Sequence, residues 1–176
     1  MRSQVILLAS FLTVLTISCS SIYDISYDYD KQTNFAGLKT YYWSAVPKEA
    51  KIDALLQERI KSAIITELAA KGLKLSPDDP DFLIAMQTMK KEKVSYSPQS
   101  AGYIYGPYWY GPKYSQYTYE EGTLVLDFVD TVSKKLIWRG TAKGLVDYNM
   151  TPAKLDNLVD EAVHKMFENF PPPSPR

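Results

Sequence analysis

Residues 123–142 read TLVLDFVDTVSKKLIWRGTA, and this stretch decides the fold class. In its first half, successive side chains would point to opposite faces of a strand, which places Leu124, Leu126 and Phe128 together on one face. The run Thr-Val-Ser-Lys that follows suits a turn, and residues 135–142 return as a partner strand. The stretch therefore predicts an antiparallel hairpin whose apolar face needs a second layer to cover it.

Two helices are available to form that layer. Residues 52–71 carry apolar side chains at three- and four-residue spacing, with Asp53 as a candidate N-cap and Gly72 directly after the last turn. A second helix is expected after Thr151-Pro152, which pairs a favoured N-cap with a favoured first helical residue, and it stops before the prolines at 171–173. Each helix has a single apolar stripe, so each should cover one face of a sheet.

Three more strands are expected, within residues 26–30, 39–43 and 81–86. The order along the chain is then ββαβββα, and we predict an α+β fold. Its simplest form is a two-layer sandwich, in which a mostly antiparallel sheet of about five strands carries both helices on one face. The charged residues 90–93 are expected to form the solvated end of the third strand.

Residues 96–119 have an unusual composition, because eight of the fourteen tyrosines of the chain fall within them, among glycine and proline pairs. The pairs exclude a regular helix, so we predict an irregular insertion. Tyrosine combines a flat apolar face with a hydroxyl group, which suits sugars or protein partners. The candidate binding surface is Tyr103, Tyr105, Tyr108, Trp109 and Tyr110. The alternative is that the segment only fills space over the sheet or stays unfolded.

The N-terminus has the pattern of an export signal. Arg2 precedes an apolar run at residues 5–17, which as a helix spans about 20 Å, short of a roughly 30 Å hydrocarbon core. The run ends in Ser18-Cys19, which resembles the bacterial lipobox, although Thr16 stands where that pattern has a large aliphatic residue. The resemblance implies a signal peptide over residues 1–18 and an acyl anchor on Cys19.

The anchored chain is expected to begin with a lipidated tether over residues 19–25. Ser20 follows the cysteine in place of the aspartate that resembles an inner-membrane retention signal, so we expect the outer membrane. The domain then faces the periplasm or the cell surface. The membrane, reached through the Cys19 anchor, is the first expected partner, and envelope proteins or glycans are further candidates.

Charge and chemistry exclude several classes of function. Twenty basic residues balance twenty acidic ones, which argues against a nucleic-acid partner. One cysteine and one histidine leave neither a disulfide nor a zinc site of the Cys/His type, and we expect no metal or other cofactor.

His164 falls beside the apolar stripe of its helix, toward solvent. Asp127 and Asp130 are three residues apart, so on one strand they point to opposite faces. We therefore expect no catalytic activity.

Several motifs in fixed order resemble the domain-of-unknown-function 4136 family of bacterial lipoproteins. They are Tyr27-Asp28-Tyr29-Asp30, the aromatic run at 41–43, Asp79-Pro80-Asp81-Phe82, the strand from Gly122 to Asp127, and Trp138-Arg139-Gly140. The resemblance implies an α+β envelope domain over residues 26–170 and no known catalytic residues. The prolines at 171–173 predict a proline-rich tail over residues 171–176. Trp138 is expected in the core or on the sheet face.

These observations predict a lipid-anchored protein of the cell envelope with a non-catalytic binding or structural role. The alternative is a module that contacts glycan or peptidoglycan through the tyrosine-rich segment. A small hydrolase that uses paired carboxylates is the third hypothesis, and it needs two carboxylates in one cleft.

Overall fold

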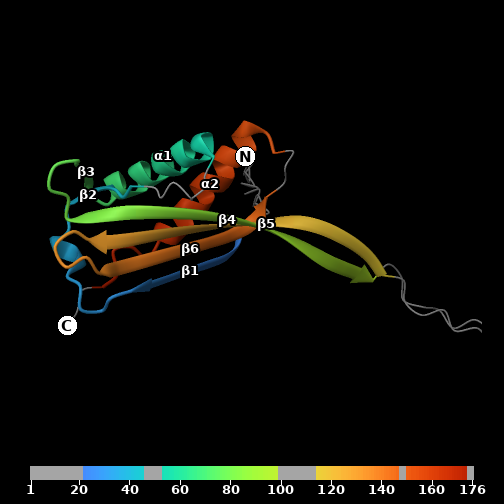
Figure 1. Ribbon diagram of the computed structural model, residues 1–176, viewed down its shortest axis with the longest axis horizontal. Helices are drawn as coiled ribbons and strands as arrows, with labels where there is room; N and C mark the ends of the chain where they lie inside the picture. The colour runs from blue at the N-terminus through green and yellow to red at the C-terminus, as the bar shows by residue number, and fades with distance from the viewer. Residues whose placement is uncertain (1–21, 46–52, 99–113, 147–149, 174–176) are drawn as a thin grey trace, which may run out of the picture.

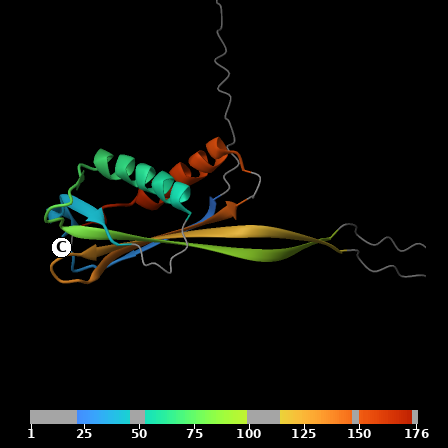
Figure 2. The same ribbon diagram turned by 45° about the horizontal axis from the view of Figure 1, so that its top comes forward.

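The computed structural model describes residues 22–45, 53–98, 114–146 and 150–173. It is an α+β fold, in which α1 (Ala54–Ala70) and α2 (Pro152–Phe167) cover the same face of one sheet (Figures 1 and 2). The predicted two-layer sandwich is therefore confirmed. No helix in the described ranges is long and apolar enough to cross a bilayer.

The sheet has six strands in the order β1-β6-β5-β4-β2-β3. Their bounds are β1 Ile22–Tyr29, β2 Thr40–Trp43, β3 Lys74–Leu75, β4 Phe82–Pro98, β5 Tyr114–Asp130 and β6 Leu136–Val146, and a short 3-10 helix, η1 (Phe35–Gly37), precedes β2. β1, β6, β5 and β4 pair antiparallel, as predicted, whereas β2 runs parallel to both β3 and β4. The parallel edge and the sixth strand differ from the prediction. A two-residue strand shows no periodicity, and α1 provides the crossover that parallel pairing needs.

β1 begins at Ile22, four residues before the expected start of the domain, and Ile25 already pairs with Ala142 of β6. Residues 22–25 therefore belong to the sheet and not to a tether. Among the described residues, the buried hydrophobic core lies between Phe35 and Phe170, and Ile22, Ile25 and Tyr29 of β1 pack against it. We therefore expect the chain from residue 20 onward to fold without the residues that precede it.

The predicted hairpin forms the centre of the sheet. Leu124, Leu126 and Phe128 are buried on its helix-facing side, and β5 pairs with β6 across the turn at 131–134. Trp138 is 1% exposed, which confirms its predicted place in the core. Its ring lies 4.7 Å from that of Phe128 and 5.4 Å from that of Phe167, measured between centroids.

The helices begin as their sequences predict. The carboxylate of Asp53 accepts a hydrogen bond from the backbone N–H of Leu56 at 3.0 Å, and Gly72 takes a φ of 82° after α1. Leu55, however, is 68% exposed, although it is one of the apolar side chains at three- and four-residue spacing within residues 52–71. The stripe that reaches the sheet runs through Ile60 and its neighbours, and Leu55 lies about 140° away from Ile60 around a 3.6-residue helix.

β4 and β5 are much longer than predicted, with 17 residues each. Their pairing runs without interruption from Phe82 opposite Asp130 to Pro98 opposite Tyr114. Residues 90–93 therefore lie in the middle of β4 and not at its end. The outer parts of the predicted irregular insertion, residues 96–98 and 114–119, are also strand.

Candidate functional site

The residues that the sequence predicted as functional lie largely outside the described ranges. Cys19 is one of them. The others are the five aromatic side chains of the candidate binding surface, Tyr103, Tyr105, Tyr108, Trp109 and Tyr110. The structure does, however, describe the two strands that lead to the aromatic segment, and these strands form the first candidate site.

Beyond the two-layer body, β4 and β5 continue as a two-stranded ribbon (Figures 1 and 2). On one side β6 makes its last pairing at Val146 with Glu120, and on the other β2 makes its last pairing at Trp43 with Ile84. We call residues 93–98 and 114–119 the arm. Over this length both outer strand edges lack a neighbouring strand within the described part of the chain.

The arm carries tyrosine on both faces. Tyr96 and Tyr114 lie on the side of the sheet that holds the helices, and they are 64% and 62% exposed. Tyr117 and Tyr119 share the opposite face with ring centroids 6.1 Å apart, and Tyr117 is 53% exposed. The arm therefore presents exposed tyrosine on both of its faces.

Charged side chains on the sheet face away from the helices form cross-strand pairs. Arg139 donates two hydrogen bonds to the carboxylate of Asp127, at 2.6 and 2.7 Å, and Lys143 pairs with Asp24 at 2.5 Å. The hydrogen bonds and the charge of Asp127 raise the pKa of Arg139. At the base of the arm, Lys93 pairs with Glu121. These pairs hold adjacent strands in register.

Asp130 and Asp81 also have structural partners. Asp130 closes the hairpin turn by accepting a hydrogen bond from the backbone N–H of Ser133. Asp81 accepts hydrogen bonds from the backbone N–H groups of Lys39 and Thr40, at 2.7 and 2.8 Å, and so ties the start of β4 to the start of β2. Among the described residues, no three His, Cys, Asp or Glu side chains group as a metal site.

His164 lies toward solvent, as predicted, with its side chain 63% exposed. Its Nδ1 is 2.9 Å from Glu67 of α1, and Arg59 pairs with Asp156 at 2.5 Å between the same two helices. The histidine therefore belongs to a pair that links the helices on their outer surface.

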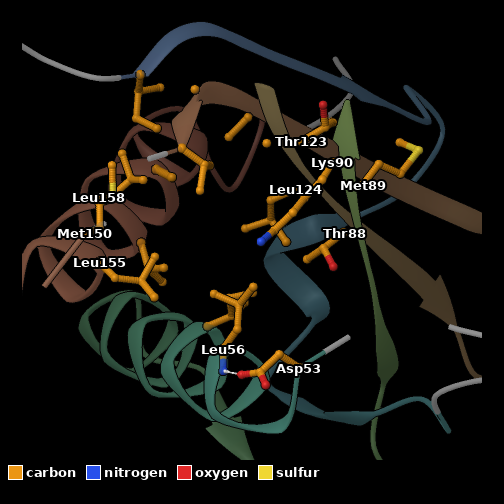
Figure 3. A pocket seen from close by; sticks show the side chains of 18 residues that line it. Asp53, Leu56, Thr88, Met89, Lys90, Thr123, Leu124, Met150, Leu155 and Leu158 are labelled. Atoms are coloured by element: carbon orange, nitrogen blue, oxygen red, sulfur yellow. Dashed lines mark hydrogen bonds between the residues drawn. The ribbon is translucent and has the colours of Figure 1, made fainter. Parts of the chain in front are cut away.

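The second candidate site is a cavity of about 270 Å³ between the sheet and the N-terminal halves of both helices (Figure 3). The sequence did not predict this cavity. Gly122 and Gly144 pair directly across β5 and β6, and the side chain of Val146 covers Gly122, where a Cβ atom would lie 2.5 Å from its Cγ2. The walls are mainly aliphatic, and they are formed by Leu56, Ile60, Leu124, Val146, Met150, Leu155, Leu158 and Val159.

Lys90 lines the same cavity from β4, directly opposite Gly122. In Figure 3 its side chain lies among those of the residues that line the cavity. Met89, the preceding residue of the strand, is also among the residues that line the cavity, although its side chain points the other way from that of Lys90 in Figure 3. The one sequence signal for this site is the pair of glycines inside strands, which often marks a close approach of another group.

The structure thus defines a small α+β domain in which two helices cover a mixed sheet. A family model identifies the family to which the chain belongs. The chain belongs to the family described as domain of unknown function DUF4136, whose model matches residues 25–172. The expected family membership is therefore confirmed. No curated protein matches the chain.

Comparison with solved structures found matches at low sequence identity. A PDZ domain protein from Parabacteroides distasonis ATCC 8503 superimposes with a TM-score of 0.57 at 16% identity, over 87% of this chain. This chain spans only 36% of that protein's length. A PelC dodecamer from Paraburkholderia phytofirmans gives a TM-score of 0.48 at 10% identity, over 82% of this chain and 94% of that one.

Proposed function

We propose that this protein is a lipid-anchored component of the bacterial cell envelope, with the arm as its non-catalytic binding element. The carrying observation is the arm itself, a two-stranded ribbon with exposed tyrosines and strand edges that meet no other strand in the described chain. A lone two-stranded ribbon is marginally stable in water, and open edges are ready templates for an added strand. An envelope protein that supplies a strand would satisfy both needs.

The anchor is supported by the apolar run at residues 5–17 and by Ser18-Cys19 after it. Two or more acyl chains hold a protein stably at a membrane, whereas one does so only marginally. Since the first strand begins at Ile22, an anchor on Cys19 would leave a connection of about three residues, or roughly 10 Å at full extension. The body would then lie close to the membrane surface.

Fractionation of cells tests the anchor. Cys19→Ala should release the protein from the membrane fraction, and Ser20→Asp should move it from the outer to the inner membrane. A Cys19→Ala protein that still partitions with membranes would show that the anchor assignment is wrong.

Site-specific crosslinking in intact cells tests the arm. A photo-reactive residue at Tyr96 should give a defined crosslinked product, and one at the equally exposed Leu55 of α1 should not. Replacing residues 93–119 with a two-residue Asn-Gly turn should abolish partner capture while the body stays folded. Equal crosslinking from both positions, or capture by the shortened chain, would refute a binding role for the arm.

A glycan contact is the second candidate, because Tyr117 and Tyr119 present neighbouring rings on one exposed face of the arm. Co-sedimentation with peptidoglycan distinguishes the two candidates. A glycan contact predicts that Tyr117→Ala with Tyr119→Ala removes sedimentation and leaves the Tyr96 crosslink in place. Sedimentation that survives both substitutions would exclude this candidate.

A further inference from the structure

We propose that the arm lies in the headgroup layer of the bilayer that holds the Cys19 anchor, with its tyrosines among the lipid head groups. This inference rests on the anchor of the proposed function, and it names a second contact for the arm. The faces of the ribbon, which carry the exposed tyrosines, would meet lipid. Its edges would stay available to an added strand.

The first observation is the level at which the anchored end of the chain enters the sheet. Ile22, the first residue of β1, pairs with Gly144 of β6. Gly144 pairs with Gly122 of β5, which in turn pairs with Lys90 of β4. The register therefore places the start of β1 level with the base of the arm.

The second observation compares the arm with the reach of the anchor. From Lys90 to Pro98, β4 continues for about eight residues, or roughly 26 Å. The connection from Cys19 to Ile22 spans roughly 10 Å at full extension. β5 lies two strands away from β1, which is again about 10 Å. The base of the arm is thus within range of the anchor, and the arm extends well beyond it.

The third observation is the direction of the arm. Figures 1 and 2 show that the arm and the two-layer body extend in opposite directions from its base. A bilayer beside the anchor cannot overlap the body. Because an arm that pointed away from the lipid would force the body into it, the arm runs along the bilayer surface or dips into it.

The fourth observation is the composition of the arm. Lys93, at the base, is the one charged residue in the sequence of the two segments 93–98 and 114–119. Tyr96, Tyr114 and Tyr117 are each more than half exposed. Tyrosine is enriched at membrane–water interfaces, where its ring meets apolar groups and its hydroxyl stays hydrated. An uncharged ribbon with exposed tyrosines therefore suits the headgroup layer.

The strand edges determine the depth of the arm. Over the arm, both outer edges lack a neighbouring strand within the described part of the chain. Their backbone N–H and C=O groups therefore need water or polar lipid groups as partners. The hydrocarbon core offers neither, which excludes open strand edges there, whereas the headgroup layer offers both. The arm thus lies at the interface and does not cross the membrane.

The charges at the base of the arm predict which lipids it accepts. Residues 90–93 and 120–121 contain three lysines and three glutamates, so the base has no net charge. Attraction to anionic head groups requires an excess of basic residues. We therefore expect the contact to be equally strong with zwitterionic and with anionic lipid.

Spin labelling of the full chain, purified with its anchor and reconstituted into phosphatidylcholine vesicles, tests the proposal. Cys19 is the one cysteine of the chain and has no free thiol when it carries lipid, so a new cysteine is the only site for the label. Labels at Tyr114→Cys and Tyr117→Cys probe the two faces of the arm. Val132→Cys is the control, because Val132 is 90% exposed in the hairpin turn at the other end of the body.

We expect both arm labels to be several-fold less accessible to a water-soluble nickel chelate than the Val132 label, and to stay accessible to oxygen, which concentrates in lipid. Val132 should remain in water, since the turn around it is charged. Adding phosphatidylglycerol should change neither result. Tyr96→Ser with Tyr119→Ser should restore nickel access at the Tyr117 label, whereas Tyr96→Trp with Tyr119→Trp should not.

Equal nickel access at the arm and at Val132, whether high or low, would overturn the proposal. Protection that disappears when the protein is diluted with lipid would assign the cover to a second copy of the chain, and protection that needs phosphatidylglycerol would assign it to the lysines. Either result would refute the tyrosine contact. The mass of the purified protein tests the anchor separately. An acylated chain with unprotected arm labels refutes this inference alone, and a chain without acyl groups refutes the proposed anchor as well.

Discussion

Gly140→Ala should destabilise the protein more than Gly37→Ala, Gly72→Ala or Gly122→Ala. A Cβ atom at this position would lie 2.3 Å from Cη2 and 2.9 Å from Cζ3 of the Trp138 indole ring. Trp138 is 1% exposed, and the rings of Phe167 and Phe170 lie against it with centroids 5.4 and 5.5 Å away. The indole therefore has no free space into which it can retreat.

The size of the effect follows from this geometry. Overpacking of a filled core destabilises by about 1–3 kcal/mol. We expect the upper end here, because the clash involves a ring held by three aromatic neighbours, Phe128, Phe167 and Phe170. The lower chain entropy of alanine in the unfolded state offsets about 0.4–1 kcal/mol. The net loss is then about 2 kcal/mol, which for a domain of this size lowers the Tm by roughly 4–8 °C.

Urea unfolding of the chain from residue 20, followed by far-ultraviolet circular dichroism and tryptophan fluorescence, measures the loss. Gly37→Ala is the matched control, because its nearest atom lies at 3.7 Å, an ordinary contact distance, and its φ is not positive. It should be neutral or slightly stabilising. A Gly140→Ala protein within about 0.5 kcal/mol of the parent, or a Gly37→Ala protein that loses as much, would refute the packing argument.

Three further changes test the contacts that hold the body together. Burial raises the pKa of Asp81, but hydrogen bonds from Lys39 and Thr40 outweigh it and lower the pKa below its usual value. Its contribution to stability is thus present above about pH 4 and lost as the pH falls through the folded pKa, so Asp81→Asn should flatten the acid limb of a stability–pH profile. A double-mutant cycle of Asp127→Ala with Arg139→Ala should give a coupling of about 1 kcal/mol in urea unfolding, and additive losses would exclude a direct pair. Asp53→Ala should reduce the free energy of unfolding by about 1 kcal/mol, and Asp53→Ser should restore most of it.

Much of the body could be predicted from local patterns. Alternation identified the hairpin of β5 and β6, and the caps at Asp53 and Thr151 located the start of each helix. The arm was missed, although its residues are strand-like in composition. The glycines and prolines of the aromatic segment predict an irregular insertion from residue 96 onward, whereas β4 continues to Pro98 and β5 starts at Tyr114.

The sequence by itself determined the class of fold, the buried faces of the central strands, and the pattern at the N-terminus that predicts an anchor on Cys19. Each of these features is set by residues that are close together in the sequence, so each can be recognised from a short stretch of the chain. Only the tertiary structure decided that β2 runs parallel to β4 and that Gly122 faces Gly144 beneath α2. Such contacts join residues that are far apart in sequence. A cavity forms where the side chains of packed elements are too small to fill the space between them. No local pattern records where two distant elements leave a space between them.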